Sequence, residues 1–135
     1  MRQSVLQRQV LKNFGIYLNY TFTKSNTTGI EGRESEDLEL SFENKRWVMR
    51  VSLNYASDYL DELGGEGFED RFYDQQIFLD VNASYAITPK WRIFAEGNNL
   101  TNQPLRYYQG IQSRTMQSEY YNSRFNFGLK FDLFN

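Results

Sequence analysis

The chain has 135 residues, 24% of them charged and 40% hydrophobic, and its formal net charge is −2 at pH 7. This length predicts one domain. The charge balance predicts no nucleic-acid partner, because binding one would need a clustered excess of basic residues. Because Cys and His are absent, the sequence also excludes disulfides, thiol nucleophiles, His-based catalytic triads and zinc sites of the Cys/His kind.

The start of the chain has no long apolar run. In MRQSVLQRQV (residues 1–10) we expect no signal peptide, so that either the chain stays in the cytosol or its N-terminal part is missing. No segment approaches the roughly 18 apolar residues of a membrane-spanning helix. Aromatic residues are unusually frequent, at 17%, with 11 Phe and 10 Tyr.

Hydrophobic residues occupy every second position in several segments, which is the pattern of β-strands with two different faces. The pattern predicts six strands, at residues 14–23, 38–43, 47–56, 77–87, 91–98 and 123–135. Most of these segments are about ten residues long, as a tilted membrane crossing requires, whereas strands of soluble proteins are nearer five or six.

The connections between these strands alternate in length. Residues 44–45 and 88–90 form tight turns, whereas residues 24–37, 57–74 and 101–117 are long loops. Short turns at one end of an antiparallel meander and long loops at the other are typical of transmembrane β-barrels. The fold class we expect is therefore all-β, an antiparallel meander of six long strands that forms the C-terminal portion of a transmembrane β-barrel, with residues 1–135 as one partial barrel domain.

The last strand carries the clearest signal for the surroundings of the sheet. Its large apolar residues would face lipid, and they are Phe125, Phe127, Leu129, Phe131 and Leu133. The opposite face of the sheet would line the lumen with Asp80, Asn82, Ser84, Arg92, Glu96, Asn98, Arg124, Asn126, Lys130 and Asp132. Aromatic residues near strand ends would lie at the membrane interface, with Trp47 and Trp91 at the short turns and Tyr55 and Tyr120 at the long loops. The alternative is a soluble sheet that packs on its own core.

Several segments resemble one protein family. ITPKWRIFAEGNNLTNQPLRYYQG (residues 87–110) resembles the last hairpin region of TonB-dependent outer-membrane receptors, with N-N-L-T-N at residues 98–102 followed by Pro104 and then Arg106-Tyr107-Tyr108. YASDYLDELG, LDVNASY, RFNFGLKF and NFGIYLNYTFTKS are similar to the same barrels.

The resemblance implies an active transporter of the bacterial outer membrane. Such receptors have a barrel of about 22 strands filled by an N-terminal plug domain. A short N-terminal segment couples them to the TonB complex of the inner membrane, and their substrates include ferric siderophores, haem, vitamins and oligosaccharides. This chain would supply the last six strands. Its partners would be outer-membrane lipid, the remainder of the barrel, the plug, the TonB complex through the missing N-terminal part, and a small-molecule substrate.

The chain departs from the family in three places. The segment between Gly29 and Leu38 is shorter than usual, as a shortened loop or an internal deletion. At the end of the chain, the next position in the alternating series of lipid-facing residues is Asn135. The aromatic Phe134 falls between these positions. Six strands are also fewer than the roughly eight of the smallest bacterial barrels, so we expect a piece of a larger polypeptide or part of an assembly.

The long loops hold the candidate binding residues. Residues 101–117 carry the possible ligand contacts of an outer loop, which are Arg106, Tyr107, Tyr108, Gln109 and Arg114. Interfacial anchoring by tyrosine is the alternative. The acidic loop at residues 57–74 is favoured as a solvated outer loop over a cation site.

The sequence predicts no catalytic residue, no metal ligand and no cofactor, and we expect no enzyme. Two further readings stay open beside the receptor segment. One is a soluble all-β binding module, and the other is an oligomeric outer-membrane structural or adhesion protein.

Overall fold

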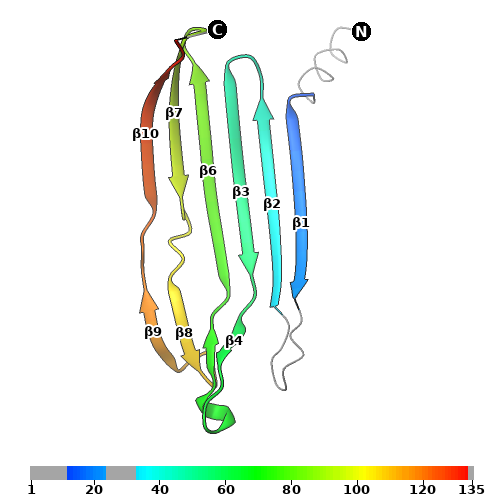
Figure 1. Cartoon of the computed structure of the whole chain (residues 1–135), viewed down its shortest axis with the longest axis vertical. Coiled ribbons are helices and arrows are strands. Elements are labelled where there is room, and N and C mark those ends of the chain that lie inside the picture. Colours follow the sequence, from blue (N-terminus) through cyan, green and yellow to red (C-terminus); the bar gives the residue numbers. More distant parts are fainter. Residues whose placement is uncertain (1–11, 24–32, 134–135) are drawn as a thin grey trace.

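The computed structural model describes residues 12–23 and 33–133, and within them the chain is all-β. The strands form two antiparallel sheets, one of six strands and one of four (Figure 1). We call the six-stranded sheet the main sheet and the four-stranded sheet the distal sheet. The sequence-based prediction of antiparallel all-β structure is confirmed.

The main sheet contains every one of the six predicted strands. Its members, in spatial order, are β1 (Phe14–Thr23), β2 (Arg33–Glu43), β3 (Trp47–Ala56), β6 (Gln76–Ala86), β7 (Trp91–Asn98) and β10 (Arg124–Phe131). β2 starts at Arg33, so the prediction of a loop over residues 24–37 is wrong for residues 33–37. β10 ends at Phe131, so Leu133 lies beyond it, and Phe134 and Asn135 are outside the described residues.

The distal sheet overturns the prediction that residues 57–74 and 101–117 are loops throughout. Its strands, in spatial order, are β4 (Tyr59–Glu62), β5 (Arg71–Tyr73), β8 (Leu105–Gln109) and β9 (Thr115–Glu119), with a short 3-10 helix, η1 (Gly67–Glu69), between β4 and β5. This order repeats that of β3, β6, β7 and β10. Each distal strand is therefore joined end to end with one strand of the main sheet, across a short break (Figure 1). The joined pairs are β3 with β4, β5 with β6, β7 with β8, and β9 with β10.

The register of the main sheet gathers apolar side chains on one face. Pairing aligns Trp47 with Tyr85 and Tyr85 with Ile93, and it places Leu129 beside Ile93. The next row toward the distal sheet contains Met49, Ala83, Ala95 and Phe127. These side chains form the apolar face, which is open to the surroundings, since Phe127 is 77% exposed and Leu18 of β1 72% exposed.

The opposite face of the main sheet is polar. One row across it contains Arg50, Asn82, Glu96 and Asn126. Asn82 Nδ2 donates a hydrogen bond of 2.9 Å to Glu96 Oε1. The predicted separation of apolar and polar residues onto two faces is therefore observed, because a strand directs successive side chains to opposite sides.

Buried side chains gather around the junction of the two sheets. Among the described residues the buried apolar ones are Ala56, Leu60 and Tyr108, and Gln76 is the buried polar one. Ala56 ends β3 and Gln76 begins β6, while Leu60 and Tyr108 belong to the distal sheet. The main sheet therefore has no core of its own between the short turns and this junction.

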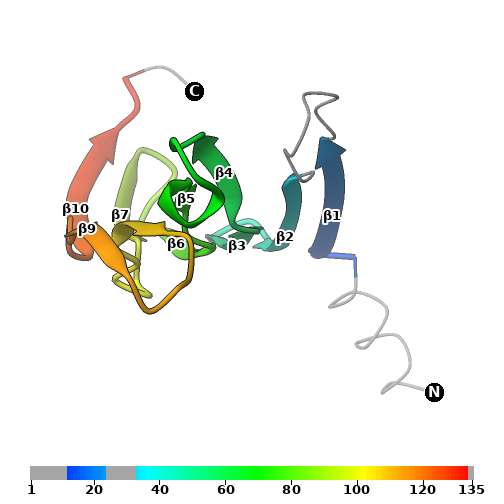
Figure 2. The same cartoon turned by 90° about the horizontal axis from the view of Figure 1, so that it is seen from below.

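The main sheet is open. β1 and β10 lie at its two edges, and each pairs with one neighbouring strand (Figure 2). The sheet does not close on itself, and the finer statement, that these strands are the C-terminal portion of a transmembrane barrel, stays a prediction. No helix within the described residues is long and apolar enough to span a membrane.

Candidate functional site

The segment from Asn98 to Asn102 ties the two sheets together. Asn99 has a φ of 53°, and its backbone N–H donates to Asp80 Oδ1 at 2.8 Å. Its side-chain oxygen accepts from the backbone N–H of Gln103 at 2.9 Å, and its carbonyl accepts from Ser123 Oγ at 2.8 Å. One asparagine, directly after β7, thereby links β6 to the segments that lead into β8 and β10. Asparagine suits this position because it adopts positive φ more readily than other non-glycine residues.

The rest of the same segment fixes its path over β6. The backbone N–H of Leu100 donates to the carbonyl of Leu79 at 2.8 Å, and Thr101 Oγ1 donates to the carbonyl of Ile77 at 2.6 Å. A Cβ atom added at Gly97 would lie 2.9 Å from Leu100 Cδ2, so the side chain of Leu100 fits against the bare glycine backbone. The N-N-L-T-N motif is therefore a structural clamp.

A cleft opens on the polar side of this clamp, where the two sheets meet. Its volume is about 660 Å³, and its polar lining includes Gln76, Asp80, Asn98, Tyr121, Arg124 and Asn126. We call it the junction cleft. The carboxylate of Asp80 and the guanidinium of Arg124 balance in charge, and the amide groups supply both donors and acceptors. The cleft therefore suits a neutral, hydrogen-bonding surface or ligand.

Sequence reasoning found part of this cleft. Asp80, Asn98, Arg124 and Asn126 were assigned to the polar face from strand alternation, and the structure brings them together. Strand alternation does not predict the other two lining residues, because Gln76 lies just before the predicted strand at residues 77–87 and Tyr121 lies just before the one at residues 123–135. Within the described residues no group of three or more acidic side chains could hold a metal ion.

Arg106 of the candidate outer loop is engaged within the protein. It lies on β8, and its Nη1 donates to Asp74 Oδ2 at 2.5 Å. Its Nε donates to Thr115 Oγ1 at 3.1 Å, and its Nη2 donates to the carbonyl of Gln112. The Asp74 side chain is only 14% exposed. This guanidinium therefore braces the distal sheet.

Tyr108 is the most enclosed of the candidate loop residues, with 4% of its surface exposed. Its hydroxyl donates to Asp58 Oδ2 at 2.6 Å, and its ring stacks on Phe72 with centroids 5.2 Å apart. Burial, followed by the hydrogen bond to Asp58, raises the pKa of the Tyr108 phenol well above its ordinary value. Its neighbour Tyr107 points to the other side, where the guanidinium of Arg71 lies 5.3 Å from the ring centroid.

Gln109 and Arg114 close the far end of the distal sheet. Arg114 Nη2 donates to Gln109 Oε1 at 3.2 Å, and Arg114 Nη1 donates to the carbonyl of Phe68 at 3.1 Å. Gln109 Nε2 donates to the carbonyl of Glu69 at 3.1 Å. The five candidate loop residues are thus brought together on β8 and the following turn, where each of them makes a contact within the sheet.

The two short turns share one design. Asn44 Oδ1 accepts from the backbone N–H groups of Arg46 and Trp47, both at 2.8 Å. Thr88 Oγ1 accepts from those of Lys90 and Trp91, at 3.3 and 3.1 Å. In each turn a polar side chain therefore holds the backbone of a basic residue and of the tryptophan that follows it.

The aromatic residues expected at an interface lie at the two ends of the main sheet. At the short turns, Trp47 contacts Tyr85 and Trp91 contacts Phe131, with ring centroids 4.6 and 4.7 Å apart. At the other end Tyr55 is half-buried, and Tyr120 is 62% exposed in the link between β9 and β10.

Comparison with known proteins provides no relative. No protein-family model, no curated protein and no solved structure matches the chain.

Proposed function

We propose that this chain is the C-terminal barrel segment of an outer-membrane receptor of the TonB-dependent kind, which takes up a small molecule with energy supplied through the TonB complex. The observation that carries the proposal is the uncovered apolar face of the main sheet. Burying one Phe or Leu side chain gains roughly 1.5–3 kcal/mol. A water-exposed face of this kind, running across six strands, would therefore forfeit most of the free energy that normally stabilises a sheet.

Hydrocarbon is the surroundings that this face fits. The exposed apolar side chains extend from β1, with Ile16 at 71% exposed, to β10, with Leu129 at 65%. In lipid each backbone polar group has to be paired, and in the main sheet the strands β1 and β10 each have a neighbour on one side only. Further strands from the rest of the receptor would pair with these edges and close the wall.

The distal sheet and the polar face fit the water-filled parts of such a receptor. Ion pairs such as Arg71 with Asp61, at 2.5 Å, belong in water and would stand on the outer side of the membrane. The polar face and the junction cleft would face the lumen, where amide and charged groups would contact the plug domain or a passing substrate.

The two open edges also support the second candidate, an outer-membrane protein whose wall is assembled from several copies of one chain. β1 and β10 run in opposite directions, because five successive antiparallel pairings separate them. Edge-to-edge pairing of two copies would therefore continue the antiparallel pattern. Cross-linking in detergent separates the candidates, since a receptor segment yields no defined oligomer of its own.

The proposal is tested by folding the purified full chain with and without lipid. We expect the chain to partition into phosphatidylcholine vesicles with a β-type circular dichroism spectrum there, and to aggregate or unfold in plain buffer. A monodisperse protein that melts cooperatively in buffer without amphiphile would contradict the proposal and favour a soluble binding module.

A further inference from the structure

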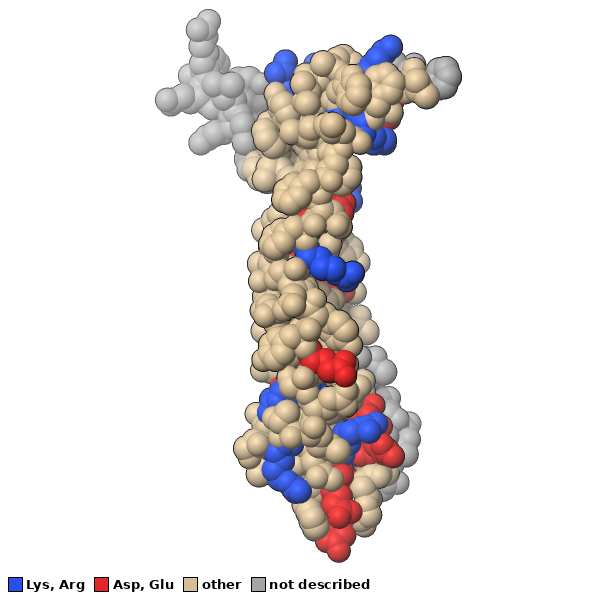
Figure 3. Space-filling view, turned by 90° about the vertical axis from the view of Figure 1, so that its left-hand side faces the viewer, with Lys and Arg blue, Asp and Glu red and all other residues tan. Residues whose placement is uncertain are grey.

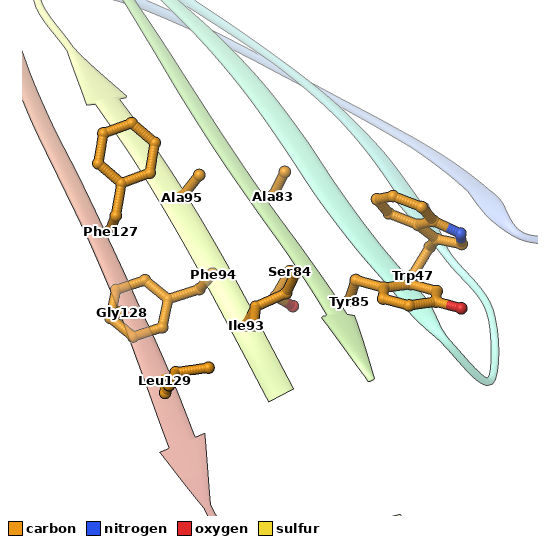
Figure 4. A pocket seen from close by; sticks show the side chains of 10 residues that line it. All are labelled: Trp47, Ala83, Ser84, Tyr85, Ile93, Phe94, Ala95, Phe127, Gly128 and Leu129. Carbon is orange, nitrogen blue, oxygen red and sulfur yellow. The ribbon is translucent and has the colours of Figure 1, made fainter. Parts of the chain in front are cut away.

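Two hollows lie on opposite faces of the described structure, and they differ in chemistry. On the apolar face, a depression of about 520 Å³ lies over Ala83 and Ala95, with Phe127 beside it (Figure 4). Its lining is almost entirely apolar, so it offers every hydrocarbon group the same kind of contact. The junction cleft opens on the polar face and combines polar side chains with aromatic rings. Of these two, the junction cleft is therefore the one that can select a ligand by its chemistry.

Polar side chains of the junction cleft are left without partners inside the protein. Asn98 and Arg124 are aligned in register on β7 and β10, and Asn126 follows on the same face of β10. Within the described residues, the side chains of these three make no hydrogen bond or ion pair with the protein. Arg106, by contrast, donates from its guanidinium to three partners. The cleft therefore presents donors and acceptors that a ligand can engage.

Aromatic rings provide an apolar platform beside these polar groups. Tyr73, Phe78 and Tyr121 line the cleft. Tyr73 also pairs across the distal sheet with Tyr59 and Tyr107, with ring centroids 5.3 and 5.0 Å apart. Because directly paired residues of adjacent strands share a face, the aromatic surface continues from the cleft across the distal sheet.

The walls of the cleft are fixed by the protein itself. Asn99 and Asn122, which both line it, adopt positive φ angles of 53° and 60°. Ser123 Oγ donates to the carbonyl of Asn99 at 2.8 Å, which ties the link before β8 to the link before β10. Uncommon backbone conformations of this kind gather at ligand sites, where the surrounding structure holds them. A preformed cleft with an aromatic and polar lining is typical of small-molecule sites.

The charge around the cleft is balanced. Asp80 and Arg124 contribute one charge of each sign to its lining. Over the distal sheet, in the lower part of Figure 3, basic and acidic side chains are interspersed, without a broad patch of one sign. A strongly charged ligand would gain little attraction from such surroundings. The cleft therefore favours a neutral ligand.

We propose that the junction cleft binds a neutral oligosaccharide. One sugar ring packs on Tyr73 and Tyr121, because the C–H groups on the face of a sugar form an apolar surface that suits a tyrosine ring. The sugar hydroxyls bond to Asn98, Arg124 and Asn126, because each hydroxyl both donates and accepts and so matches a lining of amides and a guanidinium. The inference rests on the proposed function and deepens it by naming the class of substrate.

The test uses saturation-transfer NMR on the full chain folded into phosphatidylcholine vesicles. Irradiation of the aromatic protons of the protein saturates those ligand protons that touch it. The probes are short neutral oligosaccharides of glucose, xylose, mannose and galactose, with an acidic oligogalacturonate and a glycine–serine peptide for comparison. We expect at least one neutral oligosaccharide to be saturated, most strongly at its ring C–H protons, and the acidic sugar and the peptide to show no saturation.

Two matched pairs of exposed residues localise the binding. Tyr121→Ala removes a ring of the platform, whereas Tyr120→Ala removes its neighbour, which is 62% exposed against 64% but lies outside the cleft lining. Asn126→Ala removes a polar group of the cleft, whereas Lys130→Ala changes the same face of β10 farther from the cleft. Each cleft variant should raise the dissociation constant roughly three- to tenfold, and each control by less than about twofold.

Partition and binding are measured on the same samples. If the chain enters the vesicles and no neutral oligosaccharide binds, or if binding is unchanged in both cleft variants, the sugar site is overturned while the proposed function stands. Stronger saturation of the acidic sugar or of the peptide overturns it in the same way. If the chain does not enter the vesicles, the proposed function fails, and the assignment of a transported sugar fails with it.

Discussion

The main sheet and the distal sheet are consecutive parts of the same long hairpins, yet different interactions hold them. In the distal sheet, side chains bind one another. The Tyr108 hydroxyl donates a hydrogen bond to Asp58, and Arg106 forms an ion pair with Asp74. In the main sheet, the apolar side chains point away from the protein, and Phe127 remains 77% exposed.

Under the proposed function, one pair of strands would pass from water into hydrocarbon. A strand in water needs partners for its polar groups and cover for its apolar ones, which the distal sheet supplies with paired charges and stacked rings. A strand in hydrocarbon needs backbone pairing and an apolar outer face, which the main sheet supplies. If the proposed function holds, the clamp at Asn98 to Asn102 lies where these requirements change.

The largest expected effect comes from placing a charge on the apolar face. Val51→Arg puts a guanidinium midway along β3, where lipid would surround it, and we expect a loss of about 2–4 kcal/mol in the free energy of unfolding. Ser52→Arg is the matched control on the polar face and should cost far less. Denaturant titration in vesicles measures both, and equal losses would mean that the two faces meet the same surroundings.

A smaller effect should follow from breaking the central ion pair of the distal sheet. Arg106→Leu leaves the carboxylate of Asp74 without its 2.5 Å partner, at a cost of about 2 kcal/mol. Arg50→Leu removes an exposed contact with Glu39 of 4.0 Å and should change stability by less than about 1 kcal/mol. Hydrogen exchange of the distal strands measures the loss of protection in Arg106→Leu relative to Arg50→Leu. Unchanged protection in Arg106→Leu would refute the role of Arg106 in bracing the distal sheet.

The sequence predicted the two regions unequally, for a physical reason. Alternation marks strands with one apolar and one polar face, and it located β1, β3, β6, β7 and β10 to within a few residues. It missed the start of β2, because residues 33–37 read Arg-Glu-Ser-Glu-Asp and are polar on both faces.

The distal strands lacked this signal altogether. β5 is too short to show a period, and β8 carries Tyr107 and Tyr108 side by side, with rings on both faces of one strand. The candidate loop residues were therefore recognised by type, while their partners Asp58, Asp74 and Glu69 are distant in sequence and became visible only with the fold.

The clamp between the regions offers a test of intermediate size. Asn99→Ala removes the acceptor for the Gln103 N–H and also places an alanine at a φ of 53°, for an expected loss of about 1–2 kcal/mol. Asn99→Gly loses the acceptor but tolerates the φ, so it should be less destabilising. Equal effects of the two variants on the midpoint of unfolding would show that the backbone conformation contributes nothing.

The smallest expected effect concerns Tyr108. Tyr108→Phe removes the hydrogen bond to Asp58 and should cost about 1 kcal/mol near neutral pH. The folded protein raises the pKa of this phenol above that of the unfolded chain, so the associated stability is fully present below about pH 10 and is lost as the pH rises further. Distal-sheet stability of the two proteins should therefore converge in alkali, and a constant difference across that range would contradict the assignment.

The most direct test of the central claim, that hydrocarbon contacts the apolar face, is a spin-label scan along β10. Because the chain has no Cys, each single substitution to Cys between Arg124 and Phe131 provides one attachment site. In vesicles, we predict that accessibility to oxygen, which concentrates in lipid, peaks at 125, 127 and 129 and falls at 124, 126 and 128. Accessibility without this period of two, or with the peaks at the polar positions, would contradict it.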